Sequence, residues 1–409
     1  MNKSMFRFLG FVTSLVVGSV AMGQAPWYTV LEQSPNPSVV TDASVRQKIL
    51  DSGFPWRVQD ISTGIEMLLV PPGRFQMGTS PGDAEAYSFE SPAHQVDLNH
   101  PFYLGKTKVT QAQWQAIMGN NPSYFKNYSD SASRPVEQVS WNDVASFNTA
   151  TGLRLATEAE WEYACRAGTT TVRYGVLNDI AWYGSNSGGT THAVGGKLPN
   201  AFGFYDMLGN VWEWCNDWYG AYSSNSVTDP SGAASGSIRV MRNSSWANTS
   251  NYVRASYRWG YDPSYKDEYG GFRVARTATN AVYGVLPVSG SSAGGTAVNI
   301  IGSNFSSSPT VTFGGVSATS IVVLSPNRIT AVTPAGLPGL AVLTVNGVSS
   351  EAFYYTPLCD GDFDNNGEVD SSDLGSLLIN YGSCSSSLTT VESQQEPMIF
   401  QTAEPSKPR

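Results

Sequence analysis

Oxygen-bearing side chains recur at a fixed spacing in one acidic segment, residues 362–373. Counted from the first aspartate, they fall at positions 1, 3, 5 and 12, which are Asp362, Asp364, Asn366 and Asp373. Gly367 is at position 6, where such a loop turns sharply, and Glu368 at position 7 offers its backbone carbonyl. Calcium takes roughly six to eight oxygen ligands, and loops with this spacing supply them. The segment therefore predicts a calcium site; the alternative is a soluble acidic turn that binds no ion.

The four cysteines are the next residues whose chemistry depends on their neighbours. Cys359 and Cys384 bracket the acidic segment, so we expect a local disulfide there. Cys165 and Cys215 lie beside aromatic residues, and they form either a pair or two buried free thiols. Spacing alone does not choose between the possible pairings.

The composition excludes several classes of protein. Among 409 residues, 24 are Lys or Arg and 33 are Asp or Glu, which gives a net charge of −9, and only 14% are charged. This balance argues against a nucleic-acid-binding protein, which would carry a basic patch. A hydrophobic share of 41% argues against a mostly disordered chain, and 40 Gly with 23 Pro argue against a helical bundle. We expect a loop-rich, β-leaning protein of several domains.

Charge and aromatic residues divide the chain into units. Every Trp lies between Trp27 and Trp259, Thr277–Pro357 holds only two charged residues, and Leu358–Cys384 holds six acids and no base. The predicted units are an extension with a short helix over 24–53, a Trp-rich domain over 54–276, a β-domain over 281–357, a calcium module over 358–384 and a disordered tail over 385–409.

Residues 1–23 have the pattern of a secretory signal peptide. Lys3 and Arg7 precede the apolar run Phe8–Val20, and the small-x-small site Ala21-Met22-Gly23 follows. The alternative is a membrane anchor, but spanning a bilayer takes about 20 apolar residues and this run is shorter. We therefore expect a secreted, periplasmic or cell-surface protein without a stable membrane span.

Local patterns predict the elements of the Trp-rich domain. Helices are expected over 41–50, 109–119 and 157–164, and a strand broken by a Pro-Gly turn over 65–78. Thr110 is the expected cap of the second helix, and Thr157 with Glu160 forms a capping box on the third. The residues from Gly168 onward should form irregular loops and short strands.

The same domain carries a long ordered series of short motifs. They are PPGRFQMG at 71–78, VTQ at 109–111 with Trp114, RPV at 134–136, VSW at 139–141, LRLATEAEWE at 153–162, NAFGFYDMLGNVWEW at 200–214, RVMR at 239–242, Arg258 and GGFR at 270–273. This series, over essentially all of residues 54–276, resembles the sulfatase-modifying-factor or formylglycine-generating-enzyme family. The resemblance implies an α+β fold that is related to C-type lectins, is low in regular structure and often holds calcium.

The activity that the resemblance implies needs two cysteines. Enzymes of the family oxidise a substrate cysteine to formylglycine with copper held by two thiolates, which are soft ligands suited to Cu(I). Those cysteines follow the block Arg-Val-x-x-Gly-Gly-Ser-Trp/Tyr. Here residues 239–246 read RVMRNSSW, Asn248 stands at about the first cysteine's position, and the second position falls within 250–253. Because no cysteine lies between Val240 and Arg276, we do not expect copper. A relative of the fold uses a His-rich iron site instead, but the three His of this chain are too scattered to form one.

A calcium loop of the family matches residues 206–213. On that match Asp206 and Glu213 would supply side-chain oxygens, and Gly209 and Val211 would supply backbone carbonyls. The alternative is that the two carboxylates cap turns and pair with nearby arginines.

The two C-terminal modules resemble other families. Residues 281–357 alternate like the strands of a small immunoglobulin-like β-sandwich, and GGT at 294–296 with VTFGG at 311–315 resembles the IPT/TIG domain. The G-x-S-x-G pattern over 290–294 has no following helix, so we interpret it as a turn. The loop at 362–373 resembles a dockerin EF-hand loop; since dockerins carry two, we do not expect docking to a cohesin.

Three hypotheses for function follow. The first is a non-catalytic binding or surface-assembly protein that meets a protein or carbohydrate ligand at the cell surface, with Trp212, Ser245 and Arg258 near its binding cleft. The second is an enzyme of the resembled family with altered oxidation chemistry. The third is an accessory component of a polysaccharide-degrading assembly, suggested only by the dockerin-like loop. The missing cysteine pair favours the first hypothesis.

Overall fold

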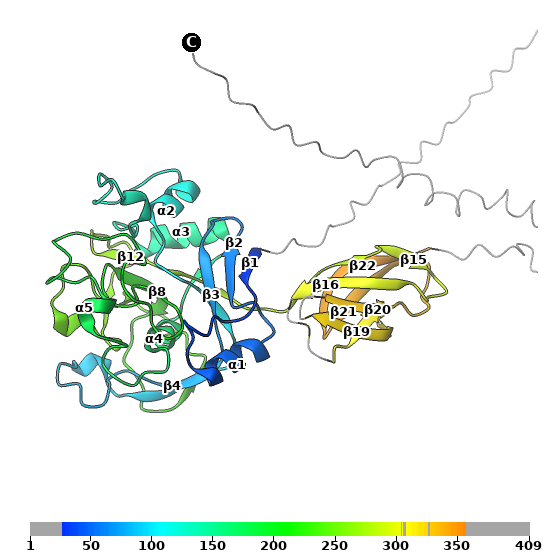
Figure 1. The fold of residues 1–409 in the computed structure, drawn as a ribbon, viewed down its shortest axis with the longest axis horizontal. Coiled ribbons are helices and arrows are strands. Elements are labelled where there is room, and N and C mark those ends of the chain that lie inside the picture. Colours follow the sequence, from blue (N-terminus) through cyan, green and yellow to red (C-terminus); the bar gives the residue numbers. More distant parts are fainter. Residues whose placement is uncertain (1–26, 304, 306–307, 326–327, 357–409) are drawn as a thin grey trace, which may run out of the picture. The chain divides into compact units, whose positions relative to one another are not determined.

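The computed structural model describes residues 27–303, 305, 308–325 and 328–356 (Figure 1). The predicted signal peptide, the calcium loop at 362–373, the pair Cys359 and Cys384 and the C-terminal tail lie outside these residues. Within them, no helix has the length and apolar character needed to cross a membrane. The chain divides into two compact units, the first holding most residues up to Tyr283 and the second most of those that follow, and each is described by itself.

A six-stranded sheet organises the first unit. Its strands, in spatial order, are β1 (Tyr28–Glu32), β2 (Arg57–Asp60), β3 (Glu66–Val70), β6 (Phe102–Gly105), β13 (Val274–Thr277) and β7 (Arg154–Leu155). The last strand of the unit therefore lies between two early ones, with Ala275 paired to both Leu104 and Arg154. This long-range pairing joins the start and the end of the unit in one sheet.

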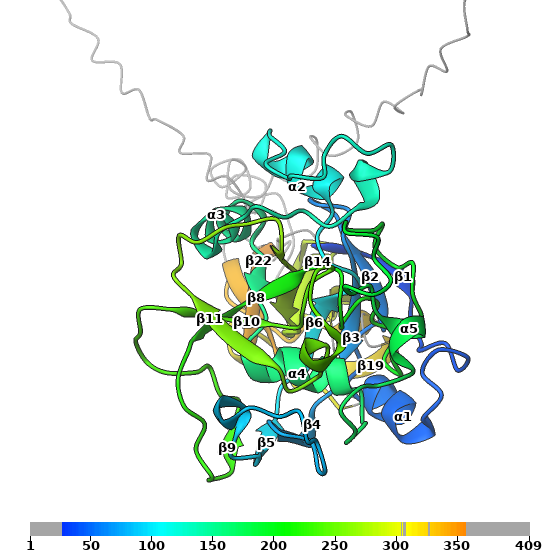
Figure 2. The same cartoon turned by 90° about the vertical axis from the view of Figure 1, so that its left-hand side faces the viewer.

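Two further sheets complete the first unit. One has the order β11 (Arg258–Tyr261), β10 (Arg239–Arg242), β8 (Trp212–Trp218) and β12 (Gly270–Phe272), and the other has the order β4 (Gly73–Met77), β5 (His94–Leu98) and β9 (Val227–Thr228). Figure 2 shows β10 between β8 and β11. Strand β8 is antiparallel to β10 and parallel to β12, so segments distant in sequence meet around it.

The helices of the first unit largely follow the sequence signals. The α-helices are α1 (Ala43–Asp51), α2 (Gln111–Met118), α3 (Trp141–Thr151), α4 (Glu158–Arg166) and α5 (Leu177–Ile180), and the 3-10 turns are Ser88–Glu90, Ser131–Ser133 and Ser250–Tyr252. Thr110 and Thr157 cap α2 and α4, as predicted, and both form capping boxes, of which only that of Thr157 was predicted. The sequence analysis missed α3, although Ser140 and Asp143 form the same kind of box at its start.

Charged side chains are buried inside the core as well as apolar ones. Among the largest fully buried side chains are Trp161 and Trp214, together with Arg242 and Arg273. Each of these guanidinium groups lies against a buried glutamate. These buried ion pairs are thus part of what holds the unit together.

The second unit is a β-rich, immunoglobulin-like body, in agreement with the predicted sandwich. One sheet has the order β14 (Ala281–Leu286), β16 (Ala297–Ser303), β20 (Arg328–Val332) and β19 (Thr319–Ser325). The other has the order β15 (Ser289–Ser291), β22 (Val348–Thr356), β21 (Gly339–Val345), β17 (Val311–Phe313) and β18 (Val316–Ser317). Gly290 lies inside β15 and a turn follows it, so the G-x-S-x-G pattern is not a strand-to-helix elbow.

Candidate functional site

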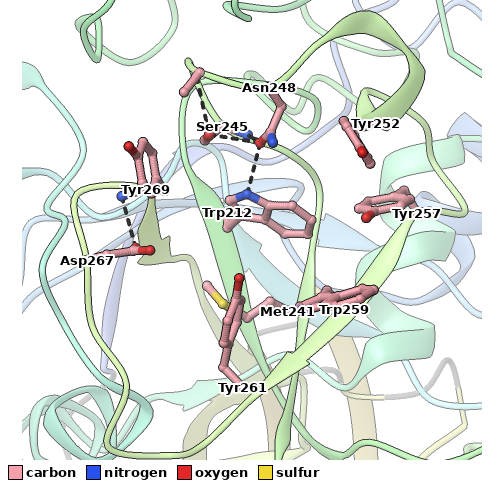
Figure 3. Close-up of a pocket in the computed structure, with 11 residues that line it drawn as sticks. Trp212, Met241, Ser245, Asn248, Tyr252, Tyr257, Trp259, Tyr261, Asp267 and Tyr269 are labelled. Carbon is pink, nitrogen blue, oxygen red and sulfur yellow. Dashed lines mark hydrogen bonds between the residues drawn. The ribbon is translucent and has the colours of Figure 1, made fainter.

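An aromatic cleft of about 360 Å³ opens in the first unit (Figure 3). It is lined by Trp212, Met241, Ser245, Ala247, Asn248, Tyr252, Tyr257, Trp259, Tyr261, Asp267 and Tyr269. Strands β8, β10 and β11 supply four of these residues, and the chain over 245–269 supplies the others. The cleft is therefore built on a sheet, whose backbone pairing fixes the floor.

A hydrogen-bond fork holds Trp212 at the centre of the cleft. The Oδ1 atom of Asn248 accepts from the Trp212 indole Nε1 at 3.0 Å, from the Ser245 backbone amide at 2.7 Å and from the Ser245 hydroxyl at 2.8 Å. The first of these bonds satisfies the only polar atom of the indole, so the apolar face of the ring is left for the cleft. The ring of Tyr257 lies 5.5 Å from that of Trp212 and tilts by 55°.

Packed rings form the walls on either side of Trp212. Tyr252 and Tyr257 meet edge to face at 5.1 Å, and Tyr261 stacks on Tyr265 at 4.2 Å. Trp259 is 41% exposed, which makes it the most accessible tryptophan of the cleft. Aromatic rings with fixed orientations offer large contact areas at a small cost in conformational entropy.

The opposite side of the cleft is acidic. Asp267 accepts hydrogen bonds from the Tyr269 backbone amide at 3.0 Å and from the Tyr265 hydroxyl at 2.6 Å. Among the described residues it forms no ion pair. Burial raises the pKa of the nearby Glu137 carboxyl to about 7, and the charges of Glu268 and Asp267 add to that shift. The lining contains no Lys, Arg or His, so Asp267 is its one charged residue.

The predicted copper positions hold no thiol. Asn248 lies in the cleft, where the resemblance would put the first cysteine, and Val253 is completely buried. Cys165 and Cys215 are unpaired and buried, and neither lines the cleft. Burial raises the pKa of Cys165 to about 12 and that of Cys215 well above its usual range, so both stay protonated near neutral pH.

The structure brings together the four residues of the predicted calcium loop, but Glu213 is already paired. Its carboxylate accepts from Lys108 Nζ at 2.5 Å, from Trp161 Nε1 at 2.9 Å and from Arg273 Nε at 3.0 Å. The same Nζ donates to the backbone oxygen of Asp206 at 2.5 Å. Burial alone would raise the pKa of Glu213, but Arg273 and Lys108 outweigh it and hold the value at about 2.

The two backbone carbonyls of that loop also have a donor. Asn243 Nδ2 donates to the oxygens of Gly209 at 2.8 Å and Val211 at 2.9 Å. The Oδ2 atom of Asp206 accepts from the Gly195 amide at 2.7 Å, while its buried Oδ1 has no partner. Across the part of the chain that the structure describes, no group of three or more His, Cys, Asp or Glu side chains could hold a metal ion.

Arg258 does not line the aromatic cleft with Trp212 and Ser245. It lies against a second cavity of about 240 Å³, where it forms a two-pronged ion pair with Glu158 at 2.7 and 2.8 Å. Asp217 lines the same cavity and accepts from the Glu158 backbone amide at 2.9 Å. Sequence reasoning found Trp212 and Ser245 but missed the aromatic residues from Tyr252 to Tyr269, whose density in 18 positions was the available signal.

Comparisons with known proteins agree with this architecture. Residues 57–278 match the model of the sulfatase-modifying factor enzyme 1-like domain, and residues 281–358 match the IPT/TIG domain. Neither match includes the acidic segment at 362–373.

Individual relatives cover the first domain. The chain is 32% identical over 238 residues to the serine/threonine-protein kinase pkn1 of Chlamydia pneumoniae, which is 52% of this chain but only 38% of that protein. It is 27% identical over 278 residues to the formylglycine-generating enzyme of Streptomyces coelicolor, covering 51% and 88% of the two chains. The solved structure of Treponema denticola variable protein 1 is 33% identical, with a TM-score of 0.49, over 52% of this chain and 95% of that one.

Proposed function

We propose that this chain, which belongs to the sulfatase-modifying factor enzyme 1-like family through residues 57–278, is an exported binding protein that takes its ligand in the aromatic cleft without copper chemistry. The IPT/TIG domain and the acidic segment at 362–373 act as accessory modules, the latter stiffened by calcium. Export rests on the pattern of residues 1–23.

The role of Asn248 carries the proposal. A residue at a thiolate's position would have to leave an electron pair free for the metal, whereas the Asn248 oxygen takes up three donors of this chain. Those bonds fix Trp212 and the backbone of Ser245, both of which line the cleft. Asn248 therefore stabilises the lining of the cleft, which suits a binding surface and not a redox centre.

The lining indicates which ligands the cleft accepts. Six aromatic rings offer faces for stacking, and the amide of Asn248 and the hydroxyl of Ser245 offer polar contacts nearby. The carboxylate of Asp267, in a lining that contains no basic residue, disfavours an anionic ligand. A neutral carbohydrate, or a neutral or cationic segment of a protein at the cell surface, fits these contacts.

A first experiment tests the absence of the oxidase reaction. The purified full chain is incubated with Cu(I), oxygen and a Cys-x-Pro-x-Arg peptide, and the peptide is analysed by mass spectrometry for the aldehyde. We expect no aldehyde, with a copper-loaded formylglycine-generating enzyme as the positive control. Aldehyde formation that depends on this chain would contradict the proposal.

A second experiment tests the cleft itself. The full chain is screened on a glycan array and on a peptide array, and the strongest ligand is titrated against Trp259→Ala. Loss of the most exposed indole of the cleft should weaken binding roughly tenfold or more. Tyr354→Ala is the matched control, since that ring is similarly exposed at 45% but belongs to the second unit. Trp212→Ala is titrated in the same way. If Trp259→Ala and Trp212→Ala both bind the ligand as tightly as the wild type, the binding site lies elsewhere.

A further inference from the structure

The buried loop at 206–213 contains the acids of a calcium site but also their counter-charges. Asp206 and Glu213 contribute two carboxylates, and Lys108 and Arg273 contribute two cations, with exposed fractions of 0–1% for all four residues. The cluster is therefore neutral without any ion. A divalent cation placed here would add two charges in a site that water does not reach, and burial of uncompensated charge is costly.

Nitrogen donors already bind the oxygens that would face a metal in this loop. One donor, Asn243 Nδ2, serves the carbonyls of both Gly209 and Val211, and another, Lys108 Nζ, joins Asp206 to Glu213. Of the oxygens in this set, only Oδ1 of Asp206 has no partner. One available oxygen is far from the roughly six to eight that calcium requires.

The backbone conformation at position 243 allows the asparagine whose side-chain amide binds the two carbonyls. Asn243 has φ = +79°, the left-handed conformation in which glycine is common and asparagine is tolerated. In the motif of the family this position is a glycine, which has no side chain to reach the carbonyls. Asn243 keeps the backbone conformation, and its Oδ1 also accepts the amide of Gly209 at 2.6 Å.

We infer that the Lys108 ammonium and the Asn243 amide take the place of a divalent cation in the loop at 206–213, so that this domain is held there without calcium. The residues that the resemblance assigns to calcium do not fit the ion in this chain. Calcium remains predicted only for the segment at 362–373, which lies outside the described residues.

Calcium titration of the full chain tests the inference. The background is the double variant Asp362→Ala, Asp364→Ala, which removes two ligands of the predicted C-terminal loop and leaves the first domain untouched. Calorimetry with calcium chloride should show no binding by this variant, and its unfolding temperature should be the same in excess calcium and in excess EDTA, because a ligand that binds only the folded state raises that temperature.

The contrary result is specific to the loop. If calcium raises the unfolding temperature of the double variant, and Asp206→Asn in the same background removes that rise, the inference is overturned. Asp206→Asn keeps an acceptor for the Gly195 amide, so it should fold. A calcium response that Asp206→Asn leaves unchanged belongs to another site and leaves the inference standing.

A gain-of-binding variant provides a second measurement. Lys108→Met removes the ammonium and Asn243→Gly removes the amide at a φ that glycine adopts freely. In the double-variant background this pair should unfold at a lower temperature than its parent, and calcium should restore part of the loss. If calcium stabilises the parent as much as the pair, Lys108 and Asn243 do not substitute for the ion.

Discussion

The indole Nε1 of Trp212 donates to Oδ1 of Asn248 across 3.0 Å, although the two residues are 36 positions apart. This contact ties the first residue of strand β8 to the segment that follows β10. The same oxygen accepts two further bonds from Ser245. Asn248 therefore links Trp212 to Ser245, two residues that line the cleft.

Asn248→Ala should destabilise the first domain and loosen the cleft. It leaves the Trp212 indole and the Ser245 amide without their acceptor, and each buried unsatisfied group costs about 1–3 kcal/mol. Thermal unfolding and near-ultraviolet circular dichroism would measure the loss of stability and of ring order. Asn248→Asp keeps an oxygen that accepts all three bonds and should be close to wild type, and the exposed Asn99→Ala is the neutral control. If Asn248→Asp is as damaged as Asn248→Ala, the acceptor role is wrong.

Asp217 should make the stability of the domain fall as the pH rises from about 4 to about 8. Burial raises its pKa to about 8, and the Glu158 charge adds to the shift. Because the folded state holds this proton more tightly than the unfolded state, the contribution is fully present below the ordinary aspartate pKa of 3.8 and is lost as pH rises toward about 8. Asp217→Asn still offers an oxygen to the Glu158 amide. Its unfolding temperature between acidic and alkaline pH should fall less than that of the wild type; parallel curves would exclude Asp217 as the cause.

The sequence predicted elements whose signals are local. Thr110 and Thr157 are three residues from the glutamine and glutamate that complete their capping boxes, so α2 and α4 were visible. Helix α3 has the same arrangement in Ser140 and Asp143, but the aspartate at the third position is shorter and makes the signal weaker.

The parts that sequence could not predict depend on distant partners. The match of Glu213 to a calcium loop is local, but its pairing with Lys108 spans 105 positions and that with Arg273 spans 60. Nothing near Glu213 in the chain indicates that two cations are buried beside it. The placement of Arg258 also depends on a distant partner. The sequence predicts Arg258 near the cleft, whereas Glu158, 100 positions away, holds it at the second cavity.

Glu158→Gln should be strongly destabilising because it leaves two buried cations with too little negative charge. Glu158 binds Arg258 and Arg242 at 2.7 and 2.8 Å, and these groups outweigh burial and hold its pKa at about 2. Removing one partner of a buried ion pair costs about 3–5 kcal/mol. Chemical denaturation would measure the change in the free energy of unfolding.

The matched control for this change is Glu85→Gln. Glu85 is exposed and pairs with Arg173 at 3.5 Å, and such a surface ion pair contributes less than about 1 kcal/mol. A Glu158→Gln protein as stable as Glu85→Gln would mean that water or another acid compensates the two guanidinium groups. The stability that Glu158 contributes should also be lost as pH falls from the ordinary glutamate pKa of 4.5 toward about 2, since the folded-state pKa is the lower one.

Two glycines with nearly equal backbone angles should respond very differently to alanine. Gly119 has φ = +74° with open space around an added Cβ, whereas Gly209 has φ = +80° and a Cβ there would lie 2.3 Å from the backbone oxygen of Trp182. Both substitutions force alanine into the left-handed region, which costs roughly 1–2 kcal/mol. Only Gly209→Ala adds a collision with rigid backbone, and it would also displace the carbonyl that Asn243 binds. We expect Gly119→Ala to fold with a modest loss in the free energy of unfolding and Gly209→Ala to lose several times more, measured side by side by denaturant titration. Equal losses would show that the loop at 206–213 can move away from Trp182, which its buried hydrogen bonds should prevent.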